Sequence, residues 1–66
     1  MEIYVNGAPR RYDHELTIMA LLEELGCGGR RVAVEINQDI VPRSTYAERC
    51  VQAGDQVEIV QAIGGG

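Results

Sequence analysis

The stretch TIMALLEELG, residues Thr17 to Gly26, decides the fold, because its apolar residues recur at helical spacing. Four of them share one stripe of a helical surface: Ile18, Leu21, Leu22 and Leu25. Thr17 is a favourable N-cap residue, and Gly26 suits the left-handed conformation that ends many helices. Glu23 and Glu24 fall on the opposite, solvent-facing side. The stretch therefore predicts one amphipathic helix that must bury its apolar stripe against another element.

The residues before this helix predict a β-hairpin. Alternation over Met1 to Val5 places apolar side chains on one face of a strand. Asn6-Gly7 follows, and this dipeptide accepts the positive φ angles of a tight hairpin turn. We expect a second strand to return over about 10–13.

The residues after the helix predict further strands. Val32, Val34 and Ile36 alternate with more polar residues and indicate a third strand. Pro42 lacks an N–H group and places its strand at a sheet edge. The remaining predicted elements are a turn at 37–39, a short strand at 40–43, a helical turn at 44–49 capped by Ser44, a turn at 53–55 and a last strand at 56–63.

One helix between a hairpin and later strands has to cover one face of a mixed sheet, because nothing else in the chain buries that face. This order predicts an α+β fold of the β-grasp, ubiquitin-like type, with four to five strands and one main helix. The first and last strands are expected to be parallel neighbours at the sheet centre. We expect residues 1–63 to form a single domain, and residues 64–66 to form a flexible glycine tail.

Composition limits the partners. The 66 residues carry a net charge of −4 and include three Tyr but no Phe or Trp, which argues against nucleic acid and anionic membranes. No apolar run has the length of a membrane span, so we expect a cytoplasmic protein. Cys27 and Cys50 match no metal-ligand spacing and are expected to be free thiols. Two cysteines also exclude an iron–sulfur variant, whose cluster normally takes four.

Gly64, Gly65 and Gly66 close the sequence directly after the last predicted strand. Without Cβ atoms they would form a thin arm about 10 Å long that fits a narrow channel. A terminal carboxylate is ionised at neutral pH and needs activation before it accepts a nucleophile. The chain has no phosphate-binding loop, so ATP and its binding site would belong to a partner. Glycines at a terminus are equally compatible with a passive, frayed end.

The parity of the last strand suggests where a partner docks. If Val57 and Ile59 face the helix, Val60 and Ala62 face away, beside the glycine arm. An apolar spot there is a candidate docking site for an activating enzyme. Single exposed valines are also ordinary surface features.

The other polar clusters favour simpler interpretations. Asp13, His14 and Glu15 are consecutive and point in different directions, so a solvated loop is expected and no catalytic set. Cys27 lies between glycines, with no neighbouring base to lower its pKa. We predict no catalytic residue and no metal site in the chain.

Three blocks of sequence resemble the ThiS family of sulfur carrier proteins of thiamine biosynthesis. They are YVNG near the start, VAVEINQDIVPRSTYAE in the middle and AGDQVEIVQAIGGG at the end. The resemblance implies that Gly66 is adenylated by a ThiF-like enzyme and converted to a thiocarboxylate. Its sulfur would come by a cysteine desulfurase route, and thiazole synthase would receive it. Gly64 and Gly65 would be recognised as the tail.

Two alternatives stay open from the residues. One is a carrier for another pathway, similar to the small subunit of molybdopterin synthase, or a ubiquitin-like modifier. The other is a β-grasp binding module without catalytic activity and with a passive tail.

Overall fold

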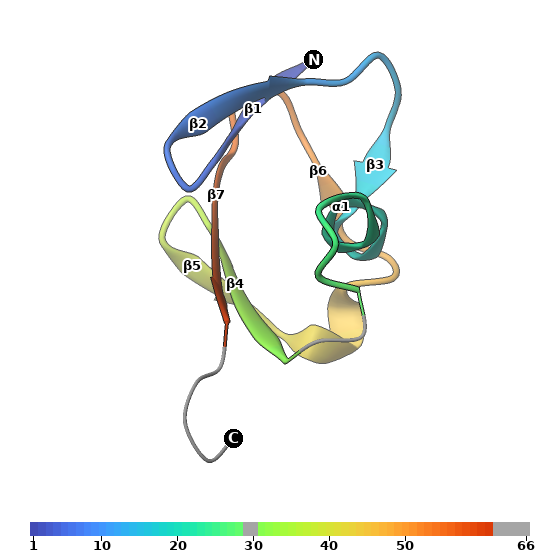
Figure 1. The fold of residues 1–66 in the computed structure, drawn as a ribbon, viewed down its shortest axis with the longest axis vertical. Helices are drawn as coiled ribbons and strands as arrows, with labels where there is room; N and C mark the ends of the chain where they lie inside the picture. Colours follow the sequence, from blue (N-terminus) through green and yellow to red (C-terminus); the bar gives the residue numbers. More distant parts are fainter. Residues whose placement is uncertain (29–30, 62–66) are drawn as a thin grey trace.

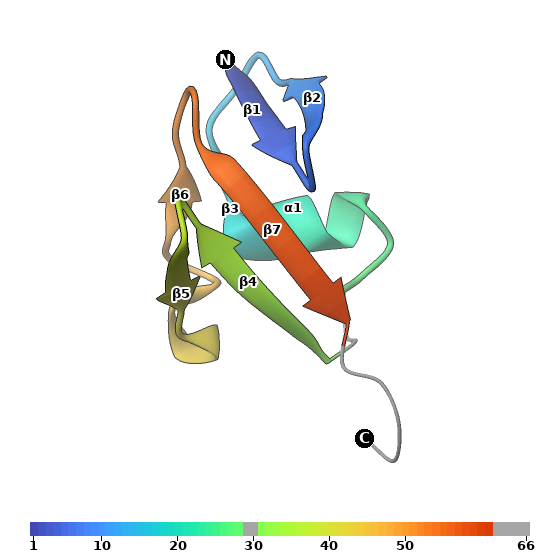
Figure 2. The same cartoon turned by 90° about the vertical axis from the view of Figure 1, so that its left-hand side faces the viewer.

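The computed structural model describes residues 1–28 and 31–61, which form a five-stranded mixed sheet with helix α1 across one face (Figures 1 and 2). The predicted α+β arrangement is confirmed. The elements in chain order are β1 (Glu2–Val5), β2 (Ala8–Arg11), β3 (Leu16–Thr17), α1 (Ile18–Glu24), β4 (Val32–Ile36), β5 (Asp39–Val41), the 3-10 helix η1 (Arg43–Thr45), β6 (Cys50–Val51) and β7 (Gln56–Gln61).

Strand β7 lies at the centre of the sheet, whose order is β2-β1-β7-β4-β5. It runs parallel to β1, with Tyr4 opposite Gln56, and antiparallel to β4. Figure 2 shows β7 between β1 and β4 with α1 behind it. The predicted parallel pairing of the first and last strands is therefore confirmed.

Helix α1 begins and ends as its sequence predicts. The Thr17 hydroxyl accepts a hydrogen bond from the backbone N–H of Ala20 at 3.1 Å, which caps the first turn. Gly26 follows the helix with a φ of +80°, in the left-handed region that glycine tolerates. The helix buries Ile18, Leu21 and Leu22 against the sheet.

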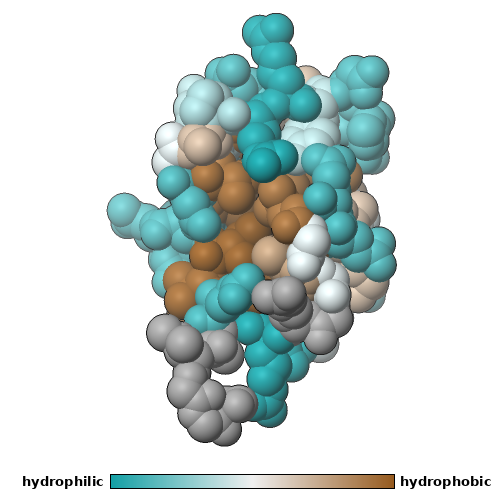
Figure 3. All heavy atoms as spheres, in the orientation of Figure 1, coloured by the Kyte–Doolittle hydropathy of each residue, from teal (hydrophilic) through white to brown (hydrophobic). Residues whose placement is uncertain are grey.

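The core fills the space between α1 and the sheet. Alternate residues of β1, β4 and β7 supply the sheet side of the core: Ile3, Val5, Val32, Val34, Ile36 and Val57. In Figure 3 the apolar side chains gather between the sheet and the helix, with polar side chains around them. This is the burial that the strand parity and the helical stripe predict.

The first hairpin turns more tightly than predicted. Asn6 and Gly7 have φ angles of 50° and 86°, as the Asn-Gly pair predicts. A two-residue turn lets the chain pair again at once, so β2 occupies Ala8–Arg11. The prediction of a second strand over 10–13 is wrong by two residues. Pro9 fits in β2 because that strand lies at the edge of the sheet.

The second hairpin shifts two predicted boundaries. Asn37 and Gln38 form its turn with φ angles of 52° and 73°, so Asp39 already belongs to the edge strand β5. Strand β5 ends at Val41, so the prediction of a strand over 40–43 that contains Pro42 is wrong. The predicted helical turn starts one residue early, with Arg43, and Pro42 precedes it. The prediction of Ser44 as its cap is wrong, because Ser44 lies inside η1.

Two short strands were not predicted. Leu16 pairs with Val51 and Thr17 with Cys50, so β3 and β6 form a separate two-stranded sheet. Residues 62 and 63 of the predicted last strand lie outside the described residues. In the described part of the chain, no helix has the length and apolar character needed to cross a membrane.

Candidate functional site

The candidate site lies on the face of the sheet that α1 leaves uncovered, around the distal half of β7. Val57 is buried under the helix and Ile59 packs partly against the same core. Val60 points away from the helix, and 59% of its surface is exposed. The predicted parity of the last strand is confirmed for these residues.

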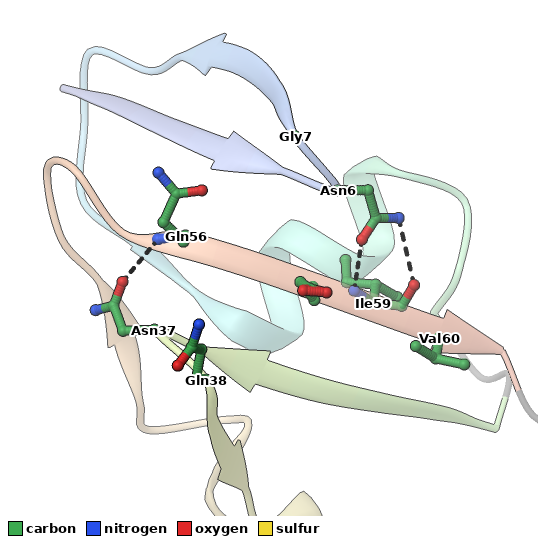
Figure 4. A pocket seen from close by; sticks show the side chains of 8 residues that line it. Asn6, Gly7, Asn37, Gln38, Gln56, Ile59 and Val60 are labelled. Carbon is green, nitrogen blue, oxygen red and sulfur yellow. Dashed lines mark hydrogen bonds between the residues drawn. The ribbon is translucent and has the colours of Figure 1, made fainter.

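Asn6 holds the distal half of β7 on the side where β1 has ended. Val5, the last residue of β1, lies opposite Val57, so no strand pairs with β7 beyond that point on this side. The Asn6 side chain replaces the missing strand (Figure 4). Its Oδ1 accepts a hydrogen bond from the Ile59 N–H at 2.8 Å, and its Nδ2 donates to the Ile59 carbonyl at 3.3 Å.

Asn37 plays the corresponding part at the start of β7. Its Oδ1 accepts a hydrogen bond from the Gln56 N–H at 3.0 Å, and its Nδ2 donates to Asp55 Oδ1 at 3.2 Å. Asn37 lies in the turn between β4 and β5, whereas Asn6 lies in the turn between β1 and β2 (Figure 4). One asparagine from each hairpin turn therefore fixes the position of the central strand.

Sequence reasoning assigned both asparagines to turns and missed these contacts. Asn6 and Ile59 are 53 positions apart, so no local pattern could have linked them. Asparagine suits positive φ by itself, which explains its presence in a turn without any second role.

A hollow of about 830 Å³ lies on the open face between the two hairpin turns. Its lining is both polar and apolar and includes Asn6, Asn37, Gln56, Glu58, Ile59 and Val60 (Figure 4). Cross-strand pairs continue this surface onto β4, with Val60 opposite Ala33 and Glu58 opposite Glu35. Ile40 on β5 adds an apolar side chain that is 77% exposed, the highest value for a large apolar residue in the described part of the chain. The open face thus combines apolar spots with carboxylates.

Of the predicted site residues, the structure describes Val60 alone. Gly66, Gly64, Gly65 and Ala62 lie outside the described residues, so their predicted roles stay predictions. The strand that precedes them is well defined. It ends at Gln61, which pairs with Val32 at the beginning of β4.

The Asp13 and His14 side chains are exposed, as the sequence predicts, but the prediction that these two point in different directions is wrong. His14 Nδ1 lies 2.9 Å from Asp13 Oδ1, and this hydrogen bond holds the pKa of Asp13 below its ordinary value. Tyr12 lies beside them. Burial raises the pKa of Tyr12, and its hydroxyl is buried without a hydrogen-bond partner among the described residues.

Cys27 and Cys50 are free cysteines, as predicted. Cys27 is half-buried against the core, and its Sγ lies 3.9 Å from the Leu25 carbonyl. Across residues 1–28 and 31–61, no three His, Cys, Asp or Glu side chains converge on a possible metal position.

These features define a class of protein. It is a small β-grasp domain whose central strand, fixed on both sides, leads directly into a glycine-ended segment. Comparison with known proteins narrows the class. The family model of the ThiS family matches residues 3–66, and the chain belongs to the ThiS family.

Three relatives show the extent of the similarity. The chain is 39% identical to the sulfur carrier protein ThiS of Escherichia coli, with all of both chains covered. A crystal structure of the thiamine biosynthesis protein ThiS from Geobacter metallireducens superposes with a TM-score of 0.84 at 33% identity, again over both whole chains. A thiazole synthase of Paramagnetospirillum magneticum is 50% identical over 66 residues. The chain spans only 20% of that longer protein.

Proposed function

We propose that this protein is a sulfur carrier of thiamine biosynthesis, used as a co-substrate and not as an enzyme. The family match over residues 3–66 carries the proposal, because it extends through the final glycines. The end-to-end similarity to a protein named sulfur carrier protein ThiS supports it.

The chemistry would take place at the carboxylate of Gly66. A carboxylate oxygen attacks the α-phosphorus of ATP, and pyrophosphate leaves. A sulfide-equivalent nucleophile then forms a C–S bond at the acyl carbon, the bond to the AMP oxygen breaks, and a thiocarboxylate results. Gly64, Gly65 and Gly66 carry no side chain to crowd this carbon. ATP would be held by the partner, which we take to be a ThiF-like adenylating enzyme.

The thiocarboxylate sulfur would pass to thiazole synthase. A thiazole synthase contains a segment that is 50% identical to this entire chain, which supports a functional link between the two. We propose a cysteine desulfurase route as the origin of the sulfur, on the basis of the family resemblance alone.

The open face of the sheet would meet the adenylating enzyme. Val60 lies one residue before the end of β7 and is largely exposed, so a protein that takes up the following segment also reaches this side chain. Ala62 has the same parity in the sequence and would extend the apolar contact.

Intact-mass spectrometry tests the proposal. The protein is purified from cells and also incubated with a ThiF-like enzyme, ATP and a sulfide source. A carrier gains the mass difference between one sulfur and one oxygen atom, and AMP is released. The same spectrum establishes whether Gly66 carries the free α-carboxylate that this chemistry requires.

Three other results would contradict the proposal. A protein-sized mass addition would identify a ubiquitin-like modifier. An unchanged mass, with no AMP released, would identify a passive binding module. Transfer of the sulfur to a molybdopterin synthase partner in preference to thiazole synthase would assign the carrier to the other pathway.

A further inference from the structure

A basic hollow surrounds the point where β7 ends. Its volume is about 310 Å³, and it is lined by Arg31, Val32, Ala33, Arg43, Val60 and Gln61. Arg31 directly precedes β4, whose first residue pairs with Gln61, so Arg31 lies beside the last described residue of β7. Arg43 reaches the same hollow from η1.

Packing of η1 fixes the backbone that carries Arg43. Tyr46, directly after η1, is buried, and its hydroxyl donates a hydrogen bond to the Val32 carbonyl at 3.4 Å. The Tyr46 carbonyl in turn accepts a hydrogen bond from the Met19 N–H at 3.0 Å. These contacts tie η1 both to α1 and to the beginning of β4. Arg43 therefore extends from a fixed backbone, and it lines the same hollow as Arg31.

Among the described residues, neither Arg31 nor Arg43 forms an ion pair. Within residues 1–28 and 31–61, the ion pairs join Arg11 to Glu2 and His14 to Asp13. Arg31 and Arg43 are exposed to water. Their unpaired charges therefore carry no free-energy cost of burial. The protein as a whole is acidic, with a net charge of −4, which makes a basic hollow at this position a local exception.

We propose that Arg31 and Arg43 form a docking site for carboxylates at the mouth of the partner's channel that admits the C-terminal segment. This inference rests on the proposed function and adds that the partner surface around the channel is negatively charged. Opposite charges at the rim of an interface accelerate association and fix the register of two proteins. Val60 lines the same hollow and would supply an apolar contact to the partner.

Reach separates this site from the chemistry. Five residues follow Gln61, and fully extended they span about 17 Å. If the segment enters the channel extended, the arginines contact the rim of the channel and do not touch the acyl carbon of Gly66. Their removal should raise KM for the carrier and leave kcat unchanged.

The test compares two charge-reversed variants in adenylation by a purified ThiF-like enzyme. One carries Arg31→Glu and Arg43→Glu. The control carries Arg10→Glu and Arg49→Glu, which change the net charge equally at exposed positions that do not line this hollow. We expect the first variant to raise KM at least about tenfold at low ionic strength, with unchanged kcat. At about 1 M salt the difference should largely disappear.

A variant that keeps both charges completes the experiment. The double variant Arg31→Lys with Arg43→Lys should have a KM close to that of the wild-type protein, with the same dependence on salt. If the wild-type protein is fully active and the Arg31→Glu, Arg43→Glu variant has the same KM as the control variant, the docking site is refuted and the proposed function is not. A loss confined to kcat would refute the docking site in the same way. If the wild-type chain is not adenylated, the proposed function fails and the docking site fails with it.

Discussion

Replacing Asn6 with glycine isolates the side-chain contacts that hold the distal half of β7. Asn6 has a φ of 50°, which glycine adopts freely, so the turn itself is retained. The variant removes the hydrogen bonds to the Ile59 N–H, at 2.8 Å, and to the Ile59 carbonyl, at 3.3 Å. On that side of β7 no strand takes their place, because β1 ends at Val5.

The expected loss of stability follows from these contacts. The shorter hydrogen bond contributes about 1 kcal/mol and the longer one about 0.5 kcal/mol. The greater freedom of glycine in the unfolded chain adds about 0.5 kcal/mol. The free energy of unfolding should therefore fall by about 2 kcal/mol. For a domain of this size, that corresponds to a decrease in Tm of roughly 8–16 °C.

Hydrogen exchange followed by NMR shows whether the loss is local. Backbone groups alternate along a strand, so the Ile59 amide faces Asn6 and the Val60 amide faces β4. In Asn6→Gly, protection of the Ile59 amide should fall at least about tenfold more than protection of the Val60 amide. Asn37→Gly is the matched control, because Asn37 has a φ of 52° and bonds the other end of β7.

Two results would refute this reasoning. One is a decrease in Tm of less than about 2 °C in Asn6→Gly, far below the value expected from two lost hydrogen bonds. The other is equal loss of protection at the Ile59 amide in Asn6→Gly and Asn37→Gly, which would mean that Asn6 stabilises the fold as a whole and not this part of β7.

Four further changes test other features. Tyr12→Phe removes a hydroxyl that is buried without a partner among the described residues, so urea unfolding should show equal or up to about 1 kcal/mol greater stability; a clear loss would reveal a bond. Gln38→Gly should gain up to about 1 kcal/mol in the same assay, because Gln38 has a φ of 73°. Val60→Thr should raise KM for adenylation severalfold with Tm unchanged. Deleting Gly66 should abolish adenylation and leave Tm unchanged; a melted domain would contradict the predicted 1–63 boundary.

Elements with a strong apolar period could be predicted from the sequence. The apolar stripe of α1 and the alternating apolar residues of β4 both form buried faces. Such faces can be read from the sequence because apolar residues recur at the period of the helix or strand that buries them. The order of these elements was enough to predict the sheet and its central parallel pair. The exposed position of Val60 followed from the same parity.

Features that depend on distant partners could not be predicted. The two residues of β3 and the two of β6 show no period, and they form strands because they lie opposite each other. The first residues of β2 were missed because proline is unfavourable in most strands. Pro9 is accepted there because the missing N–H matters less in an edge strand than in a central strand. Arg31 and Arg43 are 12 positions apart, and their shared hollow results from the packing of η1 against β4.

The architecture fixes the central strand β7 up to Gln61, its last residue. A strand projecting past its parallel neighbour would ordinarily fray, because one side of its backbone lacks partners. Here β4 pairs with β7 as far as Gln61, and Asn6 bonds Ile59 on the other side. The exit point of the chain is therefore fixed relative to Val60, Arg31 and Arg43. Under the proposed function, a partner that binds this surface would find the end of β7 in a fixed position, which lowers the entropic cost of association.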